Sequence, residues 1–231
     1  MPDINSLKIG AVGWIEVENS PKRKIWEVSE SETIVLDFII PTDFKKDLLD
    51  PEIQKEFEGF ATKGKGVLID FEVTKIKGLE VAKQIYKFRY PDSLALIYIG
   101  TLAFPLADFC YILKCQCIET GTTGMREAAV EIILSKDKPR EKSKKDPIFI
   151  NSMEEYFELI KQTPLTKLPA DDEKYDEGFP EHPLSKTRYY LKYFADNLIV
   201  DLNLQNAKPY RVSSIKSSGF LDKIRGFFNN D

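Results

Sequence analysis

The chain has 231 residues, of which 42% are hydrophobic, 12% aromatic and 30% charged. This composition excludes a disordered chain and is sufficient for a buried core, either as one large domain or as one domain with an appended element. The net charge of −4 argues against a nucleic-acid-binding protein, because such proteins usually carry a basic excess or a basic face.

The first elements in chain order are predicted to be strands. Apolar residues alternate along residues 7–17, and a turn leads from there into a second strand over residues 23–29. Residues 33–40 give the clearest pattern, because apolar side chains share one face and Asp37 lies on the other. Pro41 ends this strand, since proline cannot donate a ladder hydrogen bond.

A helix and two further strands follow. Residues 50–62 predict a helix in which Asp50 is the cap and Pro51 takes the first helical position. Alternation over residues 66–76 predicts a strand with Val67, Ile69, Phe71 and Val73 on one face. Residues 78–90 fit parts of both a helix and a strand. A strand is favoured, because a glycine and a proline bracket a run with several aromatic residues.

Residues 94–113 are apolar enough and long enough to test as a membrane span. Pro105 and Asp108 lie in this stretch and supply turn chemistry, and an aspartate in lipid is costly. The sequence therefore predicts a hairpin of strands over residues 94–103 and 109–118, and no integral membrane segment.

Helices dominate the second half of the chain. The turn Gly121-Thr122-Thr123-Gly124 precedes a predicted helix over residues 125–134. A second short helix is predicted over residues 152–161, with Ser152 as its cap. A longer helix follows Pro183, with Ser185 as its cap and with four apolar positions at helical spacing: Leu184, Leu191, Phe194 and Leu198.

This order of elements predicts an α+β fold, with a largely antiparallel sheet flanked by helices and a helical C-terminal extension. We divide the chain into a sheet domain with helices over residues 1–135 and a charged connector over residues 136–150. A helical extension over residues 151–205 packs on the same domain, and residues 206–231 form a linker and a short amphipathic tail helix.

The block from residue 33 to residue 134 resembles the PsbP-like family. The resemblance rests on a strand that ends in Phe38-Ile39-Ile40-Pro41, a following helix, several long antiparallel strands, and a helix that opens with Met125-Arg126-Glu127-Ala128-Ala129. It implies a small binding or accessory protein without catalysis. No functional residue of this chain is assigned from the resemblance.

The glycine-threonine turn is the first candidate site. Amides at a helix N-terminus hold a phosphate or carboxylate, so Thr122, Thr123, Gly124 and Arg126 are candidate ligand-binding residues. The Lys-Ser/Thr ending of a phosphate-binding loop is absent, and the alternative is a tight turn in which a threonine caps the helix. Arg126 and Glu127 are expected to form surface or rim ion pairs.

Cysteine and histidine placement predicts no metal site and no cofactor. Cys115 and Cys117 share one strand face and Cys110 points to the other, so the three are expected to be buried thiols and not zinc ligands. His182 is the sole histidine, which excludes a metal site that needs two. Its place before Pro183 suits a loop or a helix entry.

Two charged or amphipathic segments remain. The acidic run Asp171, Asp172, Glu173, Asp176 and Glu177 lacks the pattern of a calcium loop and is expected to be a solvated loop beside the basic residues 136–146. In the tail helix, five apolar residues share one side and are candidate partner-binding residues: Phe220, Leu221, Ile224, Phe227 and Phe228. The tail docks on a partner, lies on a membrane, or packs on its own domain.

The sequence favours a non-enzymatic binding or accessory protein, with a protein partner bound through the tail helix, a sheet face or a sheet edge. Three unpaired cysteines and an opening without a signal-peptide pattern predict a cytoplasmic protein that binds no nucleic acid. The alternative is an enzyme with a small anion-binding pocket at the Gly121–Gly124 turn. There Arg126 would hold the substrate, and Cys117 or His182 would perform the chemistry.

Overall fold

The computed structural model describes residues 2–42, 44, 46–91, 93–135 and 152–212. The predicted charged connector and the amphipathic tail helix, with its five candidate partner-binding residues, lie outside the described residues. The predictions made for those two segments therefore stay predictions.

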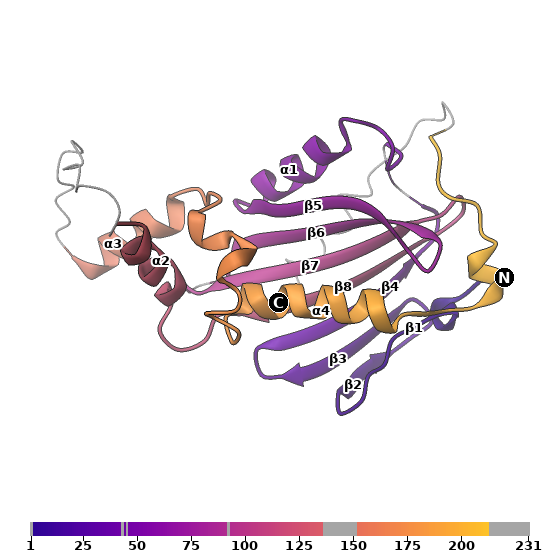
Figure 1. The fold of residues 1–231 in the computed structure, drawn as a ribbon, viewed down its shortest axis with the longest axis horizontal. Coiled ribbons are helices and arrows are strands. Elements are labelled where there is room, and N and C mark those ends of the chain that lie inside the picture. The colour runs from indigo at the N-terminus through magenta and orange to yellow at the C-terminus, as the bar shows by residue number, and fades with distance from the viewer. Residues whose placement is uncertain (1, 43, 45, 92, 136–151, 213–231) are drawn as a thin grey trace.

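A seven-stranded antiparallel sheet forms the body of the molecule, in the spatial order β2-β3-β4-β8-β7-β6-β5 (Figure 1). The predicted α+β class with a largely antiparallel sheet is thus confirmed. The ambiguous segment 78–90 is a strand, and the apolar segment 94–113 folds back as a hairpin. The strands are β2 (Ile15–Asn19), β3 (Arg23–Ser29), β4 (Glu32–Ile39), β5 (Val67–Ile76), β6 (Leu79–Arg89), β7 (Leu96–Pro105) and β8 (Cys110–Ile118).

Helices cover both faces of the sheet, so the strands are apolar on both sides. Helix α1 (Ile53–Lys63) packs on β5 and β6, and α4 (Pro183–Asn197) packs on β7 and β8 across the other face. Gly100 on β7 allows the close approach of α4, because an added Cβ would lie 2.7 Å from Thr187 Cγ2 and 2.9 Å from Cys115 Sγ.

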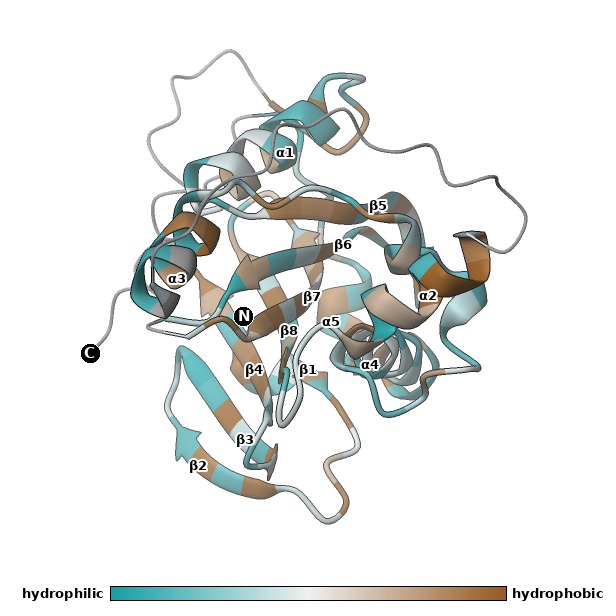
Figure 2. Cartoon of the chain, turned by 90° about the vertical axis from the view of Figure 1, so that its left-hand side faces the viewer, coloured by the Kyte–Doolittle hydropathy of each residue, from teal (hydrophilic) through white to brown (hydrophobic). Residues whose placement is uncertain are grey.

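The remaining elements gather at the two ends of the sheet. Strand β1 (Leu7–Lys8) pairs with β9 (Ile199–Val200), so the beginning of the described chain meets the end of α4. At the opposite end lie α2 and α3, which overlap in Figure 1 but stand well apart in Figure 2. The other short elements are α2 (Met125–Ser135), α3 (Met153–Gln162), α5 (Leu202–Gln205) and the 3-10 turns η1 (Ile4–Ser6), η2 (Pro169–Asp171) and η3 (Glu173–Tyr175).

Several predicted details of the strands are wrong. Residues 7–17 do not form one strand, because a turn with a positive φ of 81° at Gly13 separates β1 from β2. In β5 a bulge between Leu68 and Asp70 shifts the register, so Val67 and Ile69 face α4 whereas Phe71 and Val73 face α1.

Two helix starts also differ from the prediction. Helix α1 begins at Ile53, and Asp50 accepts the backbone N–H of Glu52 in the turn before it. Helix α4 is capped by His182 and not by Ser185, because Pro183 takes the first helical position and the His182 ring accepts the N–H of Leu184. No helix of the described residues is long and apolar enough to cross a membrane.

Candidate functional site

The residues singled out in the sequence converge where the end of β8, the start of α2 and the loop before α4 meet. We call this region the α2 corner. A pocket of about 350 Å³ lies here, and Cys117, Thr122, Arg126 and His182 contribute to its wall. Thr123 and Gly124 line a neighbouring pocket of about 330 Å³. Glu119 lines both pockets and lies between these two groups of candidates.

The glycine-threonine turn forms as predicted, but the chain itself supplies the anion. Gly121 and Gly124 have positive φ angles of 73° and 74°, which shape the turn before α2. The Glu119 carboxylate accepts the N–H of Gly124 at 2.9 Å and the N–H of Leu96 at 3.1 Å. Burial raises the pKa of Glu119, and these two amide hydrogen bonds oppose that shift. The Gly124 amide is therefore already used by an internal carboxylate.

Arg126 is a buried structural residue, and the prediction of a surface or rim ion pair is wrong. Its side chain is 1% exposed. The guanidinium donates to the Ala170 carbonyl at 2.7 Å, to Ser185 Oγ at 2.7 Å and to Asp176 Oδ1 at 2.8 Å, and it also reaches the Asp172 carbonyl. Four hydrogen bonds from this one side chain thus hold the 170–176 loop and the start of α4 together.

The acidic loop is in part buried, which corrects the expectation of a solvated loop. Asp171 pairs with Lys87 of β6 at 2.6 Å, and both side chains are 1% exposed. Asp176 accepts from both Arg126 and Arg188. The loop packs against the protein because Asp171 and Asp176 are the counterions of cations on the sheet and on α4. Asp172, Glu173 and Glu177 of the same run are exposed.

The three cysteines are buried thiols on the predicted faces. Cys115 and Cys117 belong to the core under α4, and Cys110 belongs to the core under α1. Each is at most 1% exposed. Burial raises the pKa of Cys110 and of Cys115 well above the ordinary range, so neither carries a thiolate at neutral pH. Cys117 lines the pocket wall without presenting its sulfur to solvent.

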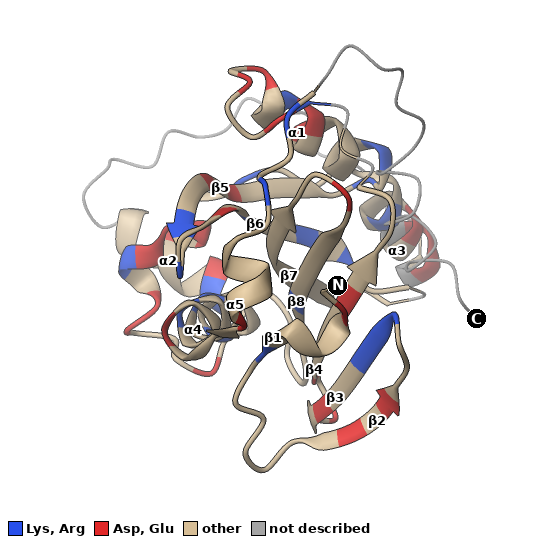
Figure 3. Cartoon of the chain, turned by 90° about the vertical axis from the view of Figure 1, so that its right-hand side faces the viewer, with Lys and Arg blue, Asp and Glu red and all other residues tan. Residues whose placement is uncertain are grey.

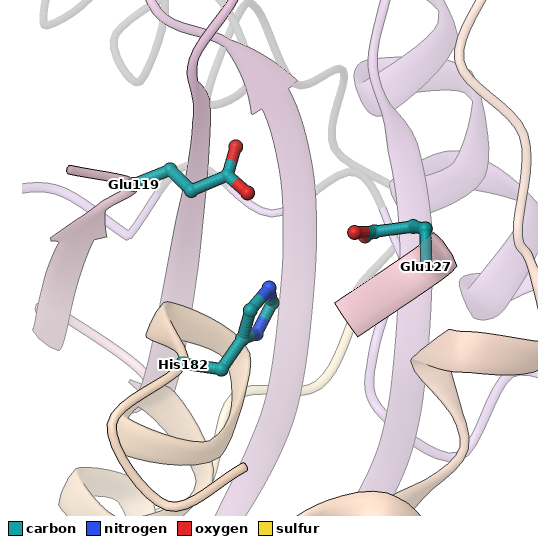
Figure 4. Close-up of side chains that lie close together, drawn as sticks. All are labelled: Glu119, Glu127 and His182. Carbon is teal, nitrogen blue, oxygen red and sulfur yellow. The ribbon is translucent and has the colours of Figure 1, made fainter. Parts of the chain in front are cut away.

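Three titratable side chains that the sequence analysis did not group come together in this corner. Glu119, Glu127 and His182 each place one nitrogen or oxygen within 4.8 Å of the others, and the histidine ring points toward the two carboxylates (Figure 4). Tyr98 contacts two members of this group, because its hydroxyl lies 3.4 Å from Glu127 Oε1 and its ring lies edge-on to that of His182. No sequence pattern signals this cluster, since His182 lies 63 residues after Glu119.

The protonation state of His182 follows from its neighbours. Burial and the nearby Arg126 charge lower the pKa of His182 to about 4, so the ring is neutral at pH 7. Nδ1 accepts the Leu184 N–H at 3.2 Å, which leaves the proton of the neutral ring on Nε2. Nε2 is buried and has no hydrogen-bond partner among the described residues, and the same holds for Glu127 Oε2.

The outward face of α2 is apolar, although its helix carries buried Arg126 and Val130 on the inner side. Met125, Ala128 and Ile132 follow one another at the spacing of a helix face, with Ile133 beside them. Met125 is 60% exposed, Ile132 59% and Ile133 48%. Figure 2 shows the brown end of α2 at the periphery of the molecule. Three large apolar side chains are thus exposed on one short helix.

The edge strand β2 is a second exposed surface with apolar side chains, Ile15 and Val17. A bulge between Glu16 and Glu18 interrupts its pairing with β3, and Figure 3 shows acidic segments along β2. Bulges and charges are devices by which proteins protect sheet edges against further strands. The β2 edge is therefore less suited to docking than the outward face of α2.

Comparisons with known proteins identify no family. No family model matches the chain, and no curated protein matches it. Among solved structures, the chain is similar to Mog1p, a Ran-binding protein of Saccharomyces cerevisiae whose crystal structure has a resolution of 1.9 Å. The identity is 15%, the TM-score is 0.45, and the match covers 86% of this chain and 93% of that chain. No residue is transferred at this level, and the resemblance to the PsbP-like family stays a prediction.

Proposed function

We propose that this protein is a non-enzymatic binding or accessory protein of the cytoplasm, and that it docks another protein on the outward face of α2. The observation that carries the proposal is the apolar face of Met125, Ala128, Ile132 and Ile133, large parts of which remain exposed. The partner that fits is an apolar helix or groove, because residues three and four apart on a helix present one continuous ridge.

The size of the patch sets the strength of the interaction. Full burial of a large apolar side chain is worth about 1.5–3 kcal/mol, so burying the exposed halves contributes about 1 kcal/mol per residue. Met125, Ile132 and Ile133 together then supply about 3 kcal/mol, or about a hundredfold in affinity. This contribution suits a reversible accessory interaction.

The contacts in the α2 corner support a binding role over the alternative of an enzyme with an anion pocket. Arg126, the residue that would hold an anionic substrate, donates to the chain itself, and the Gly124 amide serves Glu119. His182 Nδ1 caps α4, and Cys117 is 1% exposed. The enzyme alternative needs Arg126 to hold the substrate and Cys117 or His182 to react, and of these groups only His182 Nε2 lacks a partner among the described residues.

A crosslinking experiment followed by an affinity measurement tests the proposal. A photo-reactive amino acid at position 132 of the full chain is expected to capture a protein in extracts of the source organism, and the same amino acid at exposed Tyr189 on α4 is not. With the purified partner, Ile132→Asp should raise Kd by at least about tenfold, because an aspartate is costly in an apolar interface. Tyr189→Asp is the matched control and should leave Kd within about twofold. Equal Kd values for Ile132→Asp and the wild type would refute docking on α2.

A further inference from the structure

The charges of the α2 corner do not balance. Each of its buried cations faces an aspartate: Lys87 pairs with Asp171, Arg126 with Asp176, and Arg188 with both Asp70 and Asp176. Within the described residues, Glu119 and Glu127 have no ion pair. Two carboxylates that are wholly or partly buried thus lack a positive partner, which is an unfavourable arrangement unless a cation or a proton is supplied.

The geometry of the cluster leaves a place for one small ion. Because the three ligand atoms lie within 4.8 Å of one another, the two carboxylates face one ion-sized space, and the imidazole nitrogen is near enough to contact the hydration shell of an ion there. Glu127 Oε2 and His182 Nε2 are buried, lack hydrogen-bond partners among the described residues and belong to side chains that face this space. Each Glu119 oxygen accepts one amide hydrogen and retains a lone pair.

We propose that Glu119 and Glu127 bind one hydrated Mg²⁺ or Mn²⁺ ion, and that the Nε2–H of His182 donates a hydrogen bond to a water of that ion. The Leu184 hydrogen bond leaves the Nε2 nitrogen protonated, so His182 orients the hydration shell and is not itself a ligand. Ions of this class take carboxylate oxygens and keep several waters. Two pockets adjoin the cluster: Glu119 and His182 line one of about 350 Å³, and Glu119 and Glu127 line one of about 330 Å³. The ion would tie the start of α2 to the end of β8.

The single histidine makes this site directly observable. In the tag-free full chain, His182 supplies the only imidazole proton resonances, and paramagnetic Mn²⁺ bound in the cluster broadens them. These resonances are expected to disappear with less than one equivalent of Mn²⁺ and to return with excess Mg²⁺. Because this broadening acts over more than a ligand bond, the site is assigned by comparing variants of its carboxylates.

Two variants of α2 make the test specific. Glu127→Gln removes a ligand and keeps the shape of the side chain, so the same broadening should need at least about tenfold more Mn²⁺. Glu131→Gln alters an exposed carboxylate one turn further along the helix and should behave as the wild type. The proposal is overturned if the resonances stay sharp with excess Mn²⁺, if both variants respond alike, or if Zn²⁺ but not Mg²⁺ displaces Mn²⁺. The last result would make His182 a ligand. Docking on α2 does not depend on the outcome.

Discussion

Replacing Lys87 by methionine tests whether the buried ion pair with Asp171 holds the C-terminal part of the chain on the sheet. The two side chains meet at 2.6 Å and are each 1% exposed. Methionine keeps the length and apolar stem of lysine but removes the charge. Asp171 would retain the N–H of Leu168 as a donor, yet its carboxylate would stay buried without its cation.

The expected loss of stability is large because the Lys87–Asp171 pair is buried, and not because its two charged atoms are close. Breaking a buried pair by removing one partner costs about 3–5 kcal/mol. Lys83, four residues earlier on β6, pairs with Glu72 at a similar 2.7 Å, but these side chains are 36% and 53% exposed. A solvated pair is worth about 0–1 kcal/mol, so Lys83→Met is the matched control. In a chain of this length, the difference corresponds to about 6–20 °C in Tm for Lys87→Met and a few degrees at most for Lys83→Met.

Urea unfolding followed by tryptophan fluorescence measures both losses, since Trp26 lies in the core. The double variant Lys87→Met/Asp171→Asn removes the stranded charge while the new amide still accepts from Leu168. It should therefore recover at least about 1 kcal/mol relative to Lys87→Met alone. Equal losses for Lys83→Met and Lys87→Met, or simple addition of the two effects in the double variant, would show that the pair is not coupled through burial.

Two further predictions concern titration and thiol chemistry. Because the pKa of His182 falls to about 4 from 6.5 on folding, the unfolded chain binds a proton between these values that the folded chain does not. Stability should thus decline as the pH is lowered through this window, by up to about 3 kcal/mol, and urea titrations of His182→Gln should lack that share of the decline. The raised pKa of Glu119 has the opposite effect on stability, but it is present in both the wild type and the variant. Identical pH profiles for the two proteins would therefore contradict the lowered pKa of His182. The three thiols should react with an aromatic disulfide reagent only upon unfolding in urea, and fast labelling of Cys117 in the native protein would revive the enzyme alternative.

The architecture could be predicted from local sequence patterns, because the residues that form a strand or a turn are neighbours in the sequence. The β7–β8 hairpin could be predicted since a long apolar run and the turn chemistry of Pro105 and Asp108 lie within one short stretch. Apolar residues alternate along residues 7–17, yet a turn closes between Ala11 and Trp14 and breaks the strand. The bulge in β5 reverses the faces of Phe71 and Val73 without any change in the apolar count.

The turn before α2 was predictable, but the partners of its residues were not. The Gly121–Gly124 turn indicates a helix N-terminus that attracts an anion, and it does so here with Glu119 of the same chain. Arg126 looks like a surface residue until the 170–176 loop folds over it, and its partner Asp176 lies 50 residues away. Contacts between residues so far apart in the sequence depend on the tertiary fold, which the periodicity of apolar residues does not reveal.

The buried ion pairs also bear on how the polypeptide could be divided. Lys87 and Arg126 precede residue 136, whereas their counterions Asp171 and Asp176 follow residue 151. The β1–β9 ladder joins the same two stretches a second time. A nick between residues 135 and 152 would leave each piece with orphaned charges and an open apolar surface, which favours reassembly over independent folding. The chain is for this reason a candidate scaffold for fragment complementation, in which two separately expressed pieces report on each other's presence by regaining one fold.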